Sequence, residues 1–246
     1  RIHYYVGDVP QYMTARLGVD IPVSQMTYIN NLTMKPLNAS VVGSAWFSAL
    51  HPNIYVSQVS IPVAANTFAN SSYGVTDDKR TQQTLKIEDM WDMGVRGFEM
   101  VNTSDGEATT TDVTPLGNMV ASEKRQSAAG TFVDNVKLLR SKQLASFTYD
   151  DNDVMVSGDP LILICTYSAT DDGYSPARYI QNLFASLDEL KGSTYTANGV
   201  TTDLQIADNT FVQLKSSSTV KDVMGKICVI VRPGDDERWA VQGLGE

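Results

Sequence analysis

The pattern of hydrophobic and polar positions changes after about residue 45 of this 246-residue chain. Residues 1–45 contain short alternating apolar runs broken by proline and glycine, which is typical of irregular β structure. From residue 46 onward, strand-like apolar runs alternate with segments that have the 3.6-residue period of helices. We therefore expect an N-terminal β-rich segment over 1–45, or the tail of a preceding domain, followed by one domain over 46–246.

Five segments of the second region are predicted to be strands. Residues 159–169 (DPLILICTYSA) form a continuous apolar run, the pattern of a strand buried on both faces. Residues 95–101 (VRGFEMV) are also predicted to be a strand, and 226–233 (KICVIVRP) is the clearest strand of all. Weaker strand signals lie at 57–63 (SQVSIPV), which we expect to be buried, and at 209–214 (NTFVQL). Together these segments predict a buried sheet.

Three helices are predicted between the strands. Residues 84–94 carry an apolar stripe that includes Leu85. Residues 130–145 carry another stripe, and Thr131 is placed to cap it. Residues 175–192 begin with Ser-Pro and end in glycine, as many helices do. Alternation of strands and helices predicts parallel strands joined by crossover helices.

Such an order fits either a doubly wound sheet or a closed barrel. No glycine-rich phosphate loop follows any predicted strand, which disfavours a nucleotide-binding sheet. Polar residues follow the strand ends, where a β/α barrel carries its site; they are Asn66, Asn102, Asp105, Asp171 and Asp235. We therefore expect an α/β fold of the distorted TIM-type β/α barrel class.

Charge and composition disfavour some binding partners and favour one location for the protein. The formal net charge is −9 and the pI about 4.7, so neither nucleic acid nor an anionic membrane is an expected partner. No apolar stretch approaches the length of a transmembrane helix. The many Thr, Ser and Asn residues favour a secreted or cell-surface protein. Cys165 and Cys228 lie in apolar runs and are expected to be free and buried. The chain has only two histidines, His3 and His51, so a metal site built from cysteine and histidine is poorly supported.

Several of these segments occur together in one known family. Ser60-Ile61-Pro62, the stretch TQQTLKIEDMWDMGVRGFEM, the pair TFVDNVKLLRSKQL and DPLILICTYS, and the strand VMGKICVIVRP follow one another within 46–235. In order and spacing they resemble the X-domain of phosphatidylinositol-specific phospholipases C. The resemblance implies a distorted β/α barrel that cleaves a phosphodiester with the substrate's own hydroxyl as nucleophile. It also implies a histidine base, a histidine acid, and charged groups or Ca²⁺ around the phosphate.

The same resemblance implies that the catalytic positions are degenerate here. Ala65 stands at the position of the general-base histidine, and Asn66 matches the polar residue beside it. Glu99 matches the acidic residue that ends the second strand, whereas Val101 replaces a charged one. A second histidine is expected in the loop that follows, where Asp112 is the nearest ionisable side chain. We therefore expect little or no catalysis.

Three functions remain open at this point. The first is a secreted or surface module of phospholipase-C-like fold that binds a small polar ligand or glycan without cleaving it, and that needs no cofactor. Its binding candidates are Asn66, Glu99, Asp105, Tyr174 and Trp239. Another of the three functions is that of an adhesin or glycan-binding protein, in which Tyr174 and Trp239 would stack on a sugar.

The second function is a metal-dependent phosphodiesterase. Asn66, Glu99 and Asp112 would supply oxygen ligands for Ca²⁺, and a metal-bound water would replace the missing base. The plainer interpretation is that Glu99 is a strand-end acid paired with Arg96 or a backbone amide, and that Asp105 belongs to a turn.

The family's barrel has further strands after the Gly-Lys-Ile strand. Either these strands are absent from this protein, or the barrel continues beyond the sequence. In the first case a sheet edge at the C-terminal end needs a partner domain or chain to cover it.

Overall fold

The structure is a computed structural model. It describes residues 46–47, 50–76, 81–102, 116, 129–167 and 176–232. The predicted N-terminal segment over 1–45 lies outside these residues.

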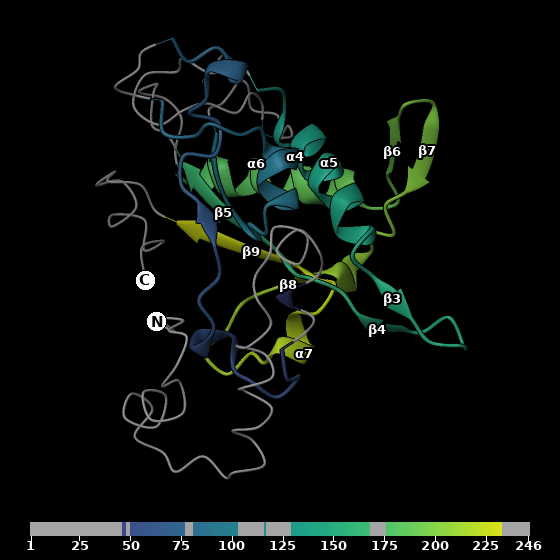
Figure 1. The fold of residues 1–246 in the computed structure, drawn as a ribbon. Coiled ribbons are helices and arrows are strands. Elements are labelled where there is room, and N and C mark those ends of the chain that lie inside the picture. Colours follow the sequence, from purple (N-terminus) through teal and green to yellow (C-terminus); the bar gives the residue numbers. More distant parts are fainter. Residues whose placement is uncertain are drawn as a thin grey trace.

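Five parallel strands form the framework of the molecule (Figure 1). In their order across the sheet they are β1 (Val63–Ala64), β2 (Gly97–Asn102), β5 (Leu161–Tyr167), β9 (Ile227–Arg232) and β8 (Phe211–Val212). The predicted parallel α/β architecture is thus confirmed. Within the described ranges the sheet is open, and closure into a barrel is not seen.

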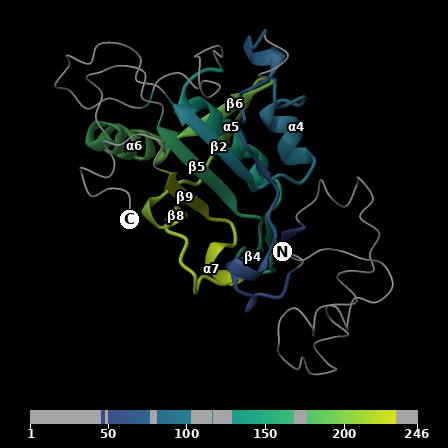
Figure 2. The same cartoon turned by 90° about the vertical axis from the view of Figure 1, so that its left-hand side faces the viewer.

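Three helices cover one face of this sheet (Figures 1 and 2). They are α4 (Ile87–Asp92), α5 (Phe132–Leu144) and α6 (Pro176–Leu190). Helix α5 lies between the other two and contacts both. As predicted, the Thr131 side chain caps α5 by accepting a hydrogen bond from the backbone N–H of Asp134.

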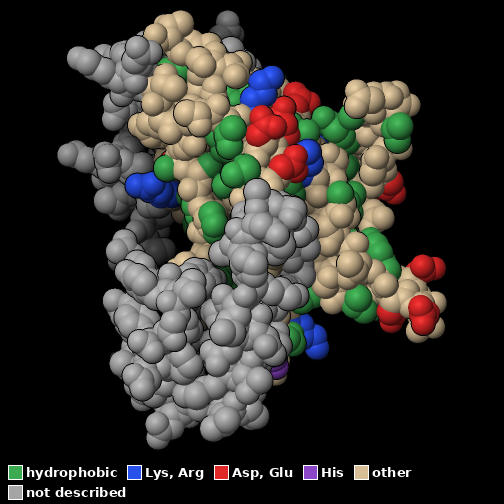
Figure 3. Space-filling model, viewed as in Figure 1, with side chains coloured by type: hydrophobic (Ala, Val, Ile, Leu, Met, Phe, Trp, Pro, Cys, Tyr) green, Lys and Arg blue, Asp and Glu red, His purple; other side chains and the backbone are tan. Residues whose placement is uncertain are grey.

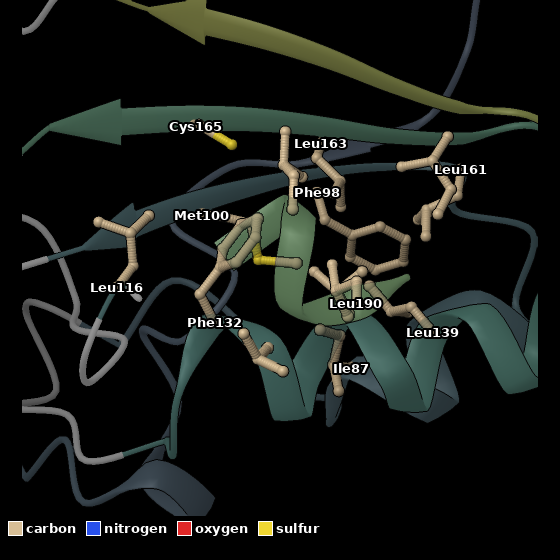
Figure 4. Close-up of a cluster of buried hydrophobic side chains, with 14 of the residues drawn as sticks. Ile87, Phe98, Met100, Leu116, Phe132, Leu139, Leu161, Leu163, Cys165 and Leu190 are labelled. Atoms are coloured by element: carbon tan, nitrogen blue, oxygen red, sulfur yellow. The ribbon is translucent and has the colours of Figure 1, made fainter. Parts of the chain in front are cut away.

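The main hydrophobic core lies between these helices and the sheet (Figure 4). Phe98 and Met100 of β2 and Leu163 of β5 are fully buried there, together with Phe132 and Leu139 of α5. Successive residues of a strand point to opposite faces, so the residues between these core positions face the other way.

We call that other side the inner face. Its residues on the three long strands are Glu99, Val101, Ile162, Ile164, Thr166, Cys228, Ile230 and Arg232. At the amino ends of the strands the inner face is covered by a second apolar cluster, which includes Phe47, Val56 and helix α7 (Val220–Val223). The polar side chains of the inner face lie at the other end, near the carboxyl ends of the strands.

Two antiparallel hairpins were not predicted. They are β3 (Thr148–Tyr149) with β4 (Met155–Ser157), and β6 (Thr194–Ala197) with β7 (Val200–Asp203). Each follows a helix and projects from the body of the molecule (Figure 1). The acidic turn of the first hairpin is visible at the right edge of Figure 3. The second turns through Asn198-Gly199, both with positive φ, a strong hairpin signal.

The strand predicted over 57–63 is wrong in most of its length. Only Val63–Ala64 pairs with β2, and Val56–Gln58 forms a 3-10 turn. Ser57 and Ser60 are exposed rather than buried. Pro62 has no N–H to donate to a ladder, which favours a strand that starts after it.

The remaining differences concern element ends. Helix α4 begins at Ile87, so Leu85 precedes it and is exposed instead of lying on the buried stripe. The strand predicted over 209–214 is reduced to the two residues of β8. None of the helices in the described part of the chain has the length and apolar character required to span a bilayer.

Candidate binding site at the carboxyl ends of the strands

Four residues from four neighbouring segments meet at the carboxyl ends of the strands, which we call the mouth. The Oε2 atom of Glu99 accepts a hydrogen bond from the backbone N–H of Asn66 at 2.7 Å. Its Oε1 atom accepts from Nη1 of Arg232 at 2.9 Å and from Oγ1 of Thr166 at 3.3 Å. This Glu99–Arg232 cluster (Asn66, Glu99, Thr166 and Arg232) joins the end of β1 to β2, β5 and β9.

The turn after β1 aims the Asn66 amide at Glu99. Asn66 has a φ of 45°, in the left-handed region that Asn tolerates better than most residues. Its side-chain Nδ2 donates to Oε1 of Gln82 at 2.7 Å, which holds the turn from outside. The neighbouring Ala65 is exposed, and its carbonyl accepts a hydrogen bond from the Gln83 side chain. The position implied for the general base therefore faces solvent as a methyl group.

The two side chains of the ion pair, Glu99 and Arg232, differ strongly in how much of their surface is exposed. The Glu99 side chain is 11% exposed, whereas that of Arg232 is 63% exposed. A guanidinium has five N–H donors, and Glu99 is the only partner of Arg232 among the described residues. This exposure leaves the guanidinium accessible to a hydroxyl or an anion. Val101, at the same level of the sheet, is fully buried and adds no charge.

Of the two alternative partners that the plainer interpretation gave Glu99, the structure shows the backbone amide. A backbone amide does bind the carboxylate, but Arg96 does not. Arg96 precedes β2 and its side chain lies at the opposite end of the sheet, where Nε is 2.6 Å from Oδ2 of Asp159. The guanidinium stacks over the ring of Trp91 at 4.1 Å. The arginine that pairs with Glu99 comes instead from the end of β9.

The other predicted site residues lie outside the described residues. They are Asp105, Asp112, Tyr174 and Trp239, and their roles in binding a ligand or Ca²⁺ stay predictions. In the part of the chain that the structure describes, no three His, Cys, Asp or Glu residues are grouped so that they could hold a metal. Both carboxylate oxygens of Glu99 already accept hydrogen bonds, so a metal there would have to replace protein donors.

No histidine lies at the described part of the mouth. His51 is exposed and precedes a stretch that packs beside α7, because the carbonyl of Ile54 accepts from the N–H of Val220. As predicted, it is therefore at the wrong end of the strands for this site. Cys165 and Cys228 are free and buried, also as predicted, and burial raises the pKa of each thiol to about 12. Neither is a thiolate at neutral pH.

Sequence reasoning missed Arg232 and Thr166. Both lie inside predicted strands, and the apolar residues around them indicate packing in a sheet and give no sign of a binding site. The two-residue period of a strand could have placed Arg232 on the same face as Cys228 and Ile230, and Thr166 on the face of Ile164. It could not have shown that these faces meet Glu99, because the register between strands is a property of the folded sheet.

Neither a protein-family model nor a curated protein sequence matches the chain. Solved structures of bacterial phosphatidylinositol-specific phospholipase C do resemble it. A double mutant of the Staphylococcus aureus enzyme matches with 12% sequence identity and a TM-score of 0.51, over 82% of this chain and 56% of that one. A single mutant of the same enzyme matches with 12% identity and a TM-score of 0.51, over 81% and 56%. The Listeria monocytogenes enzyme matches with 13% identity and a TM-score of 0.46, over 78% and 57%.

At these identities the S. aureus matches show the fold and nothing of the activity. The chain has an α/β fold whose parallel sheet corresponds to part of a phospholipase C barrel. It spans only 56% of the length of those proteins.

Proposed function

We propose that this protein is a phospholipase-C-like module that binds a small polar ligand at the Glu99–Arg232 cluster and does not cleave it. The observation that carries the proposal is the combination of a buried, fully engaged carboxylate with an exposed guanidinium, without a histidine in the described part of the mouth. The solved structures support the fold on which this site is built.

The absence of catalysis follows from proton transfer. Phosphodiester cleavage by an internal hydroxyl requires one group to accept a proton and another to donate one at the reacting oxygens. Ala65 offers no such group at the end of β1. Glu99 is committed to Asn66, Thr166 and Arg232. Histidine, the side chain best suited to proton transfer near pH 7, is absent from this part of the mouth.

The class of ligand is inferred from the hydrogen-bond donors of Arg232 beyond the one that binds Glu99. Arg232 presents several N–H groups, and the Asn66 turn and Thr166 hydroxyl lie against the same carboxylate. A hydroxyl-rich molecule can accept from the guanidinium and bridge to these polar groups. The net charge of −9 opposes long-range attraction of strongly anionic ligands. We therefore infer that the ligand is a neutral sugar or cyclitol.

An assay of turnover tests the catalytic part of the proposal. Purified protein is incubated with phosphatidylinositol, a lysophospholipid and a generic phosphodiester, each with Ca²⁺ and with a chelator. We expect no turnover in any condition. Measurable turnover that Glu99→Gln abolishes would refute the proposal, and dependence on Ca²⁺ would favour the metal-dependent alternative.

A binding assay tests the other part. Ligand-observed NMR with myo-inositol and a panel of neutral monosaccharides should find at least one binder, and Arg232→Gln should weaken it at least tenfold. Lys142→Gln is the matched control, because Lys142 is a partly exposed cation paired with Asp92 away from the mouth. Equal loss in both variants, or no binder for the wild-type chain, would contradict a site at Arg232.

The location of the protein is proposed from composition alone. Many Thr, Ser and Asn residues and a modest share of charged side chains favour a secreted or cell-surface protein. Fractionation of the native source with an antibody against the chain tests this, and recovery in the cytosolic fraction alone would contradict it.

A further inference from the structure

The inner face of β9 becomes more accessible from the amino end of the strand to its carboxyl end. Its side chains there are Cys228, Ile230 and Arg232, which alternate along the strand. Cys228 is fully buried in the second apolar cluster, Ile230 is 36% exposed, and the Arg232 side chain is 63% exposed. Ile230 is therefore an accessible apolar side chain that lies directly before the guanidinium of the mouth.

A second apolar side chain extends this surface across the sheet. The register of the parallel strands places Ile164 of β5 level with Ile230 and with Glu99 of β2. Neighbouring strands lie about 4.8 Å apart, so the two isoleucines are adjacent on the inner face, and Ile164 is half-buried. One row further along, Thr166 is level with Arg232. The polar row that ends at Arg232 thus lies beside an apolar pair, which we call the isoleucine step (Ile164 and Ile230).

We propose that the isoleucine step selects, among sugars and cyclitols, those rings that have a face free of axial hydroxyl groups. The inference rests on the proposed function, because it takes Arg232 as the group that binds the edge of the ring. Residues two apart on a strand are separated by about 6.6 Å, a spacing comparable with the width of a six-membered ring. A ring whose edge accepts hydrogen bonds from Arg232 is thus placed to cover Ile230 with one face.

The selection follows from what each kind of ring face offers to an aliphatic side chain. Equatorial hydroxyls point outward along the edge of the ring, towards the guanidinium and solvent, and leave only C–H groups on the faces. Contact of these C–H groups with Ile230 removes apolar surface from water, which is favourable. An axial hydroxyl that points at the step loses its hydrogen bonds to water and finds no partner on an isoleucine side chain, which is costly.

Three stereoisomers of inositol test the inference, because they have the same composition and no charge. In scyllo-inositol no hydroxyl is axial, in myo-inositol one face remains free, and in D-chiro-inositol each face carries an axial hydroxyl. Ligand-observed NMR titrations measure the three affinities for the wild-type chain. We expect scyllo- and myo-inositol to bind within about threefold of each other, and D-chiro-inositol to bind about tenfold more weakly or worse.

The variant Ile230→Thr isolates the contribution of the step. Threonine keeps the branching at Cβ that suits a strand, and its hydroxyl can pair with an axial hydroxyl of the ring. We therefore expect the preference against D-chiro-inositol to shrink to about threefold or less. Val200→Thr is the matched control, since Val200 is an exposed strand residue on the projecting β7, and it should leave the preference unchanged.

The outcomes separate this inference from the proposed function. Equal binding of the three inositols by the wild-type chain, in a manner that Arg232→Gln weakens, would overturn the isoleucine step and leave the site at Arg232 standing. A preference that Ile230→Thr leaves unchanged would also overturn the step. If none of the three inositols binds, the step is overturned as well, whatever the panel of monosaccharides shows about the site. The wild-type comparison decides the matter if the threonine variant fails to fold.

Discussion

Two clusters of charged residues lie at opposite ends of the same parallel sheet, and they are built from similar groups. At the amino ends, Arg96 pairs with Asp159 at 2.6 Å, and both side chains are completely buried. At the carboxyl ends, Arg232 pairs with Glu99 at 2.9 Å, but the arginine is mostly exposed. The difference in burial separates an ion pair that holds the fold from one that is accessible to a ligand.

The amino-end cluster is more extensive than one ion pair. Arg140 donates hydrogen bonds to the carbonyls of Leu204 and Gly225 and to Oε1 of Gln143. Gln143 in turn donates to the carbonyl of Asp159. These bonds join α5 to the starts of β5 and β9 in a setting without solvent. Removal of one partner there leaves buried polar groups unsatisfied, which is costly.

The largest expected effect is on the buried ion pair. Arg96→Met removes the guanidinium from Asp159 and from the carbonyls of Trp91 and Val95. We expect the free energy of unfolding to fall by about 3–5 kcal/mol, because the buried carboxylate of Asp159 then loses the guanidinium that lies 2.6 Å from it. Urea denaturation followed by tryptophan fluorescence measures this change.

The double variant Arg96→Met/Asp159→Leu is the control for that measurement. Apolar replacement of both partners removes the uncompensated charge, so stability should recover in part. Nη2 of Arg96 is buried without a hydrogen-bond partner among the described residues, which makes the native pair less than ideal. A loss below about 1 kcal/mol for the single variant would break the comparison, since exposed pairs have that size.

Arg140→Met is the next largest change. It leaves the carbonyls of Leu204 and Gly225 without a donor, and we expect a loss of about 3 kcal/mol in the free energy of unfolding. Burial lowers the pKa of Arg140 to about 10, so the native residue also carries a desolvation cost. Arg140→Lys should restore little, because one ammonium cannot reproduce the planar fork. Full recovery by lysine would show that charge, rather than hydrogen-bond geometry, is what matters.

At the mouth the same kind of substitution should do little to stability. Arg232→Gln removes an exposed guanidinium, and we expect a change within about 1 kcal/mol in the urea experiment. Together with the loss of ligand binding expected for this variant, the result would assign Arg232 to function. Global unfolding of Arg232→Gln would instead make the two clusters equivalent and would remove the physical basis for a binding site.

The two clusters also show what sequence can and cannot predict. Strands β2, β5 and β9 are recognisable because their apolar runs are long, and α5 because Thr131 and its stripe define it. Glu99 was found through the resemblance to phospholipase C. Arg232 was missed, and of the two partners considered for Glu99, Arg96 and a backbone amide, only the amide is found. Charge and spacing along the chain say nothing about which strand lies beside which, and that register decides the pairing.

The short strands illustrate a second limit. The stretch 57–63 has strand-like residues, yet only Val63–Ala64 pairs. Val56 turns instead into the apolar cluster beside α7. Val56 directly precedes the predicted strand and is buried in this cluster, and the chain reaches the sheet only at Val63. A tertiary contact of this kind leaves no mark in a seven-residue pattern.

The smallest expected effect concerns the two thiols, which lie in the sheet between the clusters. Cys165 faces the helices and Cys228 the inner face, and burial raises the pKa of each from 9.0 to about 12. Folding therefore favours the protonated thiol. The stability that this contributes is complete below pH 9 and is lost as pH rises towards 12. Between pH 7 and 9.5 we expect a loss below about 1 kcal/mol per thiol.

Urea denaturation across this pH range, with the double variant Cys165→Ala/Cys228→Ala as reference, isolates the thiol contribution from that of other titrating groups. The wild-type curve should fall more steeply than the reference. A thiol reagent at pH 8 should label neither cysteine before the chain unfolds, because both are buried within the sheet. Rapid labelling of Cys228 in the native protein would mean that the inner face opens to solvent near the amino ends. Cys228 lies in the second apolar cluster, which covers the inner face at the amino ends of the strands. Its labelling would therefore remove the contrast between a buried amino end of the sheet and an exposed mouth.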